Sequence, residues 1–356
     1  MFQKWLAFVF GILADGSSIG VGCHRVGWRD FADIAVRYRQ VSEPQDTVWW
    51  IDQLPPKAFE EGFGLQTPMV NGQLHVVRYY PYYHMAFPLM KELMVQQCDL
   101  GPAEARELEG IQDLGSLYNL VGHDFWVVAP CASTAAPGRA MEGTRLTVVA
   151  RPPGGHEFTI RTPGLPARWA DFDRELRYWF YRLEDAVLEA PLGKCTERIL
   201  DTAVTIFYYW VHFAPLSRGS AACGYILMFS ILHAAGFELE CPMKPGVQWD
   251  WEAILRPEPE SFLAVIKPWL LRKHSIIEQD GVKMVVLGDQ KNQEQRTDEL
   301  SFNGDYHGRG FDFEQISCSG ECKISSLERL PSLAAELCTS IRDTLHLLNY
   351  CDYEHS

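Results

Sequence analysis

Two apolar helical runs joined by a short polar loop constrain this fold more than any other feature of the chain. The runs are Ala203–Phe213 and Ala221–Phe237, and the tract Pro215-Leu216-Ser217-Arg218-Gly219-Ser220 lies between them. Helices that are apolar on every side belong in a core, so the runs predict a buried antiparallel helix pair. The N–H groups at the start of the second helix, with Gly219 and Ser220 as capping candidates, would favour an anion.

The composition is that of a globular protein with a sizeable core. The 356 residues are 47% hydrophobic and 22% charged, which fits one large domain or two closely packed ones. The net charge of −14 argues against binding to nucleic acid or to an anionic membrane. No apolar run reaches the length of a membrane span. We therefore expect a cytoplasmic protein.

The first 16 residues leave two interpretations open. Lys4 precedes a short apolar run from Trp5 to Ala14, which fits either a signal peptide or an ordinary first helix or strand. A signal peptide would place the chain in the lumen of the secretory pathway. The ten cysteines have no repeating spacing, which indicates reduced, mostly buried thiols. The pair Cys318 and Cys322 has no partner set for zinc, so we expect no metal and no cofactor.

The pattern along the chain predicts a helix-dominated α+β fold with a buried antiparallel helix pair and a small β-sheet. We expect a single α+β domain over 17–287, a polar flexible loop over 288–322 and a C-terminal helix over 323–356 that docks on the core. The predicted helices are 31–40, 82–97, 102–120, 168–189 and 259–273, and the predicted strands are 47–51, 76–80, 125–128, 146–149, 157–160 and 283–287.

Three blocks of sequence carry a resemblance to a known family. They are Ile34–Asp52, Gly62–Tyr80 and Tyr208–Gly224, and the last contains the unusual tract PLSRGS. In order and approximate separation they resemble the C-terminal region of tetratricopeptide repeat protein 13 and its plant counterpart, a repeat protein that restrains immune signalling. The resemblance implies a regulatory or scaffolding role with protein partners. This chain has no such repeats, so it is either a fragment of a longer product or a lineage that kept only this module.

The tract from Pro215 to Tyr225 is also similar, more faintly, to the Fic motif that wraps nucleotide phosphates. Ser220 stands where that motif has a phosphate-binding asparagine, but Ala214, Arg218 and Ala222 replace its catalytic histidine, metal-binding acid and phosphate-binding arginine. Without the histidine there is no general base, and without the acid no evident magnesium ligand. A transferase would need His212, two residues earlier, in the catalytic role.

The candidate site residues each have a structural alternative. Arg218 either grips an anion or pairs with a carboxylate that fixes the loop. Ser217 and Ser220 fit helix caps better than nucleophiles, and His212 fits a core histidine better than a base. Arg78, with Arg37 and Arg39, would complete a basic pocket around Arg218 or else pair with surface carboxylates such as Asp46. Trp49, Trp50 and the tyrosines at 79, 80, 82 and 83 would stack a planar ligand or, more simply, fill the core.

The sequence therefore leaves two main hypotheses open. The first is a non-catalytic regulatory or interaction module with an anion-binding pocket formed by Ser217, Arg218, Gly219, Ser220 and Arg78, which takes other proteins as partners and a phosphate or nucleotide as a further ligand. The second is a divergent Fic-like nucleotide or phosphate transferase that uses His212 or Ser217. A small-molecule site in the aromatic cluster is a third, weaker option.

Overall fold

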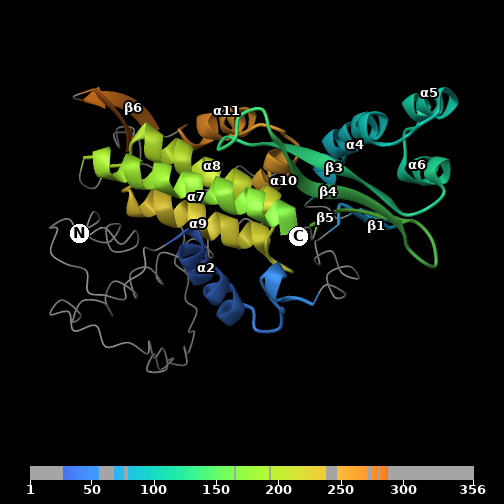
Figure 1. Cartoon of the computed structure of the whole chain (residues 1–356), viewed down its shortest axis with the longest axis horizontal. Coiled ribbons are helices and arrows are strands. Elements are labelled where there is room, and N and C mark those ends of the chain that lie inside the picture. Colours follow the sequence, from blue (N-terminus) through green and yellow to red (C-terminus); the bar gives the residue numbers. More distant parts are fainter. Residues whose placement is uncertain are drawn as a thin grey trace, which may run out of the picture.

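The structure, a computed structural model, describes residues 27–55, 68–75, 79–163, 166–191, 194–237, 247–271, 274–279 and 281–287. These residues form a helical body at one end and a sheet lobe at the other (Figure 1). This arrangement is helix-dominated α+β, as the sequence predicts.

Three long helices run side by side through the helical body. They are α7 (Pro166–Glu189), α8 (Glu197–Phe213) and α9 (Ser220–Ala234). The middle one, α8, is enclosed on every side, and its Tyr208, Tyr209 and Trp210 are almost completely buried. The predicted antiparallel pair is α8 and α9, which explains why both runs are apolar all round.

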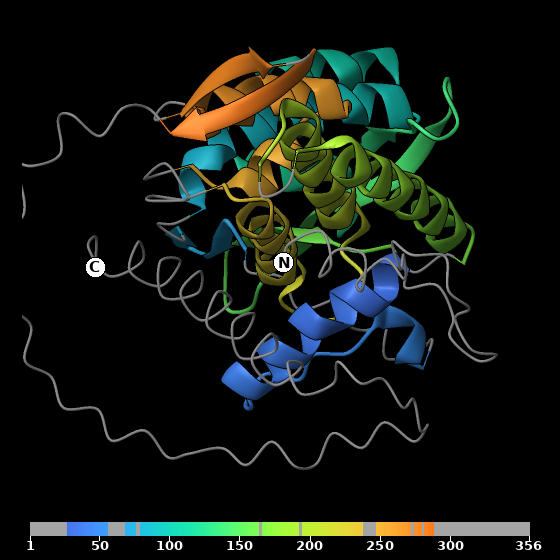
Figure 2. The ribbon, with the colours of Figure 1, turned by 90° about the vertical axis from the view of Figure 1, so that its left-hand side faces the viewer.

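Smaller elements surround these helices. Helix α2 (Trp28–Ser42) packs against α9, with a short 3-10 turn η1 (Ile51–Gln53) after it. Helices α10 (Trp249–Ile254) and α11 (Pro259–Leu270) pack on α8, and the hairpin of β6 (His274–Gln279) and β7 (Val282–Leu287) lies at the end of the body. In Figure 2, α2 lies on the side of the body opposite that hairpin.

The sheet lobe is a five-stranded antiparallel sheet in the order β2-β1-β5-β4-β3. Its strands are β1 (Val70–Gly72), β2 (Leu74–His75), β3 (Phe125–Ala132), β4 (Ala140–Ala150) and β5 (His156–Arg161). Burial alternates along β3, as expected of a strand with one face on a core. The lobe also contains η2 (Tyr80–Tyr82), α4 (Tyr83–Gln97), α5 (Pro102–Gly110) and α6 (Leu114–Val121).

The outer edge of β3 is closed by side chains and by a proline. The side-chain amide of Gln97 donates to the carbonyl of Val128 at 2.8 Å and accepts from its N–H at 2.8 Å. It thus makes the two hydrogen bonds that a neighbouring strand would make. Pro130 has no N–H to offer, and Ala132 donates to the carbonyl of Pro257 at 2.7 Å. Unpaired edge groups invite pairing with another chain, so these contacts keep this edge from acting as a template.

Three sequence predictions need correction. The single helix predicted over 102–120 is two helices, because the Asp113 carboxylate caps a new helix by accepting from the N–H of Ser116 at 2.9 Å. The strand predicted over 76–80 is absent at Tyr79 and Tyr80, which form a turn and the start of η2, and 76–78 lie outside the described residues. The strand predicted over 47–51 is reduced to one bridge, at Trp50.

Other predictions fall partly or wholly outside the described residues. The N-terminal segment 1–16, the loop 288–322 and the C-terminal helix over 323–356 all lie there. Within the described part of the chain, no helix is long and apolar enough to cross a membrane. The four cysteines described there, Cys98, Cys131, Cys195 and Cys223, are free thiols.

Candidate functional site

The loop between α8 and α9 makes its two turns with left-handed residues. Helix α8 is followed by Ala214, whose φ of 45° is unusual for a residue with a side chain, and α9 begins after Gly219, whose φ is 77°. A Cβ atom at Gly219 would lie 2.5 Å from Nε of Arg39. Position 219 therefore favours glycine for its backbone, and a larger residue would also have to displace the Arg39 side chain.

The segment 47–51 holds this loop along its length. Trp50 and Leu216 form an antiparallel bridge, and N–H groups of Ile51 and Ser217 donate to the carbonyls of Pro215 and Trp49, both at 2.9 Å. The Ser217 hydroxyl accepts from the N–H of Trp49 at 3.0 Å and donates to the carbonyl of Thr47 at 3.3 Å. Ser217 thus fastens the two segments together.

Three charged side chains meet at the outer rim of the loop. Asp46 accepts an ion pair from Arg39 at 2.6 Å and lies 3.3 Å from Nε of Arg218. The Arg218 side chain is 47% exposed, whereas those of Arg39 and Asp46 are 19% and 23% exposed. Two guanidinium groups share one carboxylate, so the rim keeps one unit of positive charge beside the N-terminus of α9. Asp46 is thus the carboxylate that pairs with Arg218, the structural alternative considered for this residue.

Ser220 has a different role from the expected cap. The N-cap of α9 is Gly219, and no side-chain hydrogen bond caps the helix there. The buried Ser220 hydroxyl instead accepts from the N–H of Leu216 at 3.1 Å and donates to its carbonyl at 3.3 Å. Its own carbonyl accepts from the indole of Trp210 at 2.6 Å. Ser220 therefore stabilises the inside of the loop.

His212 lies inside the protein, away from the rim. Its side chain is completely buried, and Nε2 lies 2.9 Å from the carbonyl of Ala253. Burial lowers the pKa of His212 to about 4, so the ring is neutral near neutral pH. Within the described structure, Nδ1 has no hydrogen-bond partner. This is the environment of a core histidine.

A buried arginine closes the end of α8. Arg168 on α7 is 3% exposed and donates from Nη1 to the carbonyl of Phe213 at 2.9 Å, from Nη2 to the carbonyl of His212, and from Nε to that of Glu142 at 2.8 Å. Its guanidinium lies over the Phe172 ring, 4.7 Å from the centroid. Burial lowers its pKa to about 9. Arg168 thereby satisfies the last carbonyls of α8, which a helix leaves without partners.

The predicted site residues divide into three groups. Ser217, Arg218, Gly219 and Ser220 stand together on the loop, His212 lies behind it in the core, and Arg78 falls outside the described residues. Trp50 is buried against Trp28 and Trp210, with ring centroids 6.1 and 5.8 Å away, and so belongs to the core, whereas Trp49 is 49% exposed. The sequence analysis missed Arg168, whose position on an amphipathic helix gives no sign that it is buried.

Comparison with known proteins places the loop in a homologous region. No protein-family model matches the chain. The chain is 38% identical over 277 residues to Suppressor of RPS4-RLD 1 of Arabidopsis thaliana, covering 73% of this chain and 26% of that protein. It is 26% identical over 259 residues to human Tetratricopeptide repeat protein 13, covering 68% and 30%. The chain thus spans less than a third of either relative.

The predicted resemblance to these two proteins is confirmed. Neither comparison supports the fainter similarity to the Fic motif.

Proposed function

We propose that this chain is a non-catalytic interaction module that acts in a regulatory protein, as part of the region it shares with its plant and human relatives. The name of the plant relative describes a suppressor and that of the human relative a repeat protein, and we extend a regulatory, partner-binding role from them to this chain. The observation that carries the proposal is the use of the loop's polar groups. The hydroxyls of Ser217 and Ser220 bond to backbone, and His212 is buried and neutral.

These contacts favour binding over turnover. A general base must reach the proton it removes, and the completely buried His212 faces a backbone carbonyl instead of the loop surface. A serine nucleophile needs an adjacent base, whereas the Ser217 hydroxyl lies between the backbone groups of Thr47 and Trp49. The transferase alternative gains no support from either residue.

We further propose that the rim of the loop binds an anionic group of a partner or a phosphate. The surplus positive charge of Arg39 and Arg218 over Asp46 supports this, together with the N-terminus of α9 beside it. Arg218 is the one of the three with half its side chain exposed, and a guanidinium has five N–H donors, so it can hold Asp46 and an anion together.

Thermal unfolding with inorganic phosphate and with ATP tests this proposal. A ligand that binds only the folded state raises the midpoint, so we expect phosphate to raise Tm for the wild type and not for Arg218→Gln. The matched control is Arg106→Gln, which removes an exposed arginine of α5 in the sheet lobe and should keep the response. Equal shifts in all three proteins would place the anion elsewhere. Hydrolysis of ATP or labelling of a protein substrate, lost on Arg218→Gln, would overturn the non-catalytic proposal.

A further inference from the structure

The outward face of α7 combines aromatic, apolar and charged side chains in a regular stripe. Arg174, Tyr178, Tyr181, Asp185 and Leu188 follow one another at spacings of four, three, four and three residues, the spacing of the seam at which two helices pair. The inward positions of α7, such as Phe172, Leu176 and Leu183, are already buried in the core. The stripe thus lies on the face of α7 opposite its core-facing side.

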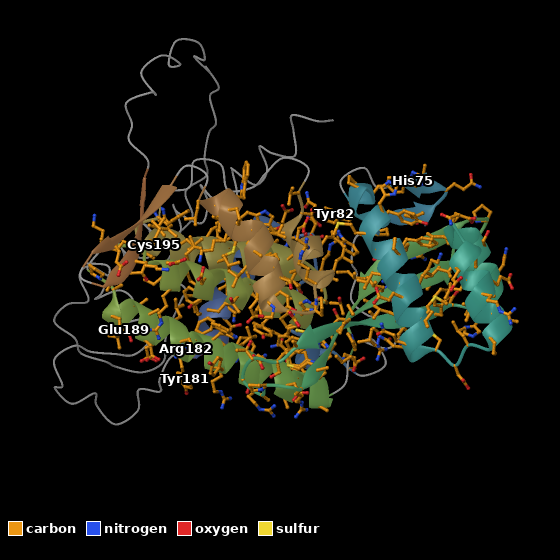
Figure 3. All side chains as sticks on the ribbon, turned by 90° about the horizontal axis from the view of Figure 1, so that it is seen from above. His75, Tyr82, Tyr181, Arg182, Glu189 and Cys195 are labelled. Atoms are coloured by element: carbon orange, nitrogen blue, oxygen red, sulfur yellow. The ribbon has the colours of Figure 1, made fainter. Side chains whose placement is uncertain are left out.

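Most of the stripe is open to solvent, and Tyr178 is half-buried against Trp179. Tyr181 is 46% exposed and Leu188 is 58% exposed, and the side chain of Arg174 is 48% exposed. Helix α7 lies on the outside of the helical body, and Tyr181 and Arg182 lie at its outer margin (Figure 3). At 24 residues, α7 is about 36 Å long, so the stripe is long enough for a helix-to-helix contact.

The order of the charges along the stripe makes it complementary to itself. Arg174 stands as far before the midpoint between residues 179 and 180 as Asp185 stands after it, and Tyr178 and Tyr181 are related in the same way. Two copies of α7 laid antiparallel about that midpoint would set Arg174 of each against Asp185 of the other. The tyrosines would meet at the centre, and the same symmetry would set Leu188 against Asp171 of the other copy, next to the exposed Ala170.

The present partners of the charged residues leave room for these contacts. Arg174 lies 3.2 Å from Asp171 within its own helix, through one of its five N–H donors. Asp185 is exposed, and the described residues give it no ion pair. A two-fold contact of this kind is isologous, since the same patch serves both copies. A parallel pairing would instead set Arg174 of one copy against Arg174 of the other, where the like charges repel.

We propose that the exposed face of α7 pairs antiparallel with α7 of a second copy of this chain. Tyr178 and Tyr181 form the apolar centre of the contact, and two equivalent Arg174–Asp185 pairs fix its direction and register. A single helix pair buries less than the roughly 1,200 Å² of a standard stable interface. We therefore expect a weak dimer that dissociates on dilution and weakens with salt.

Sedimentation of the whole chain over a range from low to several hundred micromolar, at low and high salt, tests this pairing. We expect Arg174→Asp alone and Asp185→Arg alone each to weaken the dimer by roughly tenfold, because each sets two like-charged pairs in the contact. An equimolar mixture of the two variants should recover the wild-type association, since every pair in the mixed dimer is again opposite in charge. The double variant Arg174→Asp/Asp185→Arg should recover it as well.

The controls separate this contact from general charge effects. Arg37→Asp makes the same charge change on α2 and should leave the association unchanged, and circular dichroism checks that each variant is folded. A wild-type chain that stays monomeric throughout the range overturns the proposal. So does a dimer that neither single variant weakens, or a mixture that fails to associate, because then another surface or another partner is responsible.

Discussion

Replacing Arg168 with methionine should destabilise the fold strongly although it removes a buried charge. The guanidinium serves backbone carbonyls of His212, Phe213 and Glu142, and the side chain is 3% exposed. Buried ion pairs can often be replaced by apolar residues without loss, because both partners are removed together. Here the partners are backbone groups that no substitution removes, so Arg168→Met leaves them buried without donors.

The expected loss in the free energy of unfolding follows from the backbone carbonyls that remain when Arg168 is removed. Each unsatisfied buried acceptor costs about 1 to 3 kcal/mol, and three carbonyls together lose more than the variant regains by not burying the charge. Removing one side of a buried charged contact costs about 3 to 5 kcal/mol in other proteins, and we expect a loss in that range. Since the total free energy of unfolding of a domain is about 5 to 15 kcal/mol, the effect should be plain in urea unfolding followed by tryptophan fluorescence.

Two further variants make the Arg168 experiment decisive. Arg177→Met changes an exposed arginine on the same helix and should alter the free energy of unfolding by less than about 0.5 kcal/mol. Arg168→Lys keeps the charge but lacks the planar fork that reaches several carbonyls, so it should fall between methionine and the wild type. A neutral or stabilising Arg168→Met would refute the argument that Arg168 completes the end of α8.

Two other substitutions probe the helix pair. Gly224→Ala should lower the free energy of unfolding, measured in urea, by about 1 to 3 kcal/mol, because its Cβ would lie 2.6 Å from the indole of Trp210 and 3.2 Å from Phe207. The matched control is Gly110→Ala, whose Cβ would have nothing within 4 Å. Equal losses in the two variants would argue against close packing of α8 and α9. The pKa of His212 is lowered to about 4, below its ordinary value, so the unfolded chain takes up the proton first as the pH falls. The free energy of unfolding should therefore drop by about 3 kcal/mol from pH 6.5 to pH 4 through this group. In His212→Gln, the free energy of unfolding measured across this pH range should lose that part of its pH dependence. An unchanged pH dependence in the variant would contradict the burial of a neutral ring.

The sequence predicts those parts of the fold that local patterns determine. The runs that became α8 and α9 are apolar all round, and such runs have few other places in a folded chain. The strands near 125, 146 and 157 follow from β-branched and aromatic residues between turns. The break between α5 and α6 is also visible in retrospect, since Gly110 and Asp113 are stop and start signals that a continuous helix between 102 and 120 ignores.

The sequence indicates where the candidate site lies but not which residues contact it. The tract PLSRGS stands out, yet its contacts with Trp49, Trp50 and Asp46 join residues about 170 positions apart, and no local pattern encodes that pairing. Arg168 poses the same difficulty in a stronger form, because an arginine on an amphipathic helix normally lies on the solvent side. Only the positions of the carbonyls it meets show why it is buried.

The polar tract between the two apolar helices is best explained by the burial of the helix ends. Phe213, Leu216 and Ser220 are all within 2% of full burial, so the backbone where α8 stops is shielded from water. The start of α9 is only partly shielded, because Gly219 and Ala221 are half-buried. Buried backbone groups must find partners within the protein, and the two serine hydroxyls, the 47–51 segment and Arg168 supply them. The Arg218 side chain is not needed for this purpose, because it lies half exposed at the rim, where Asp46 is its ion-pair partner among the described residues. Any selection for binding at this loop would therefore act on Arg218, while the rest of the tract would be retained for the fold.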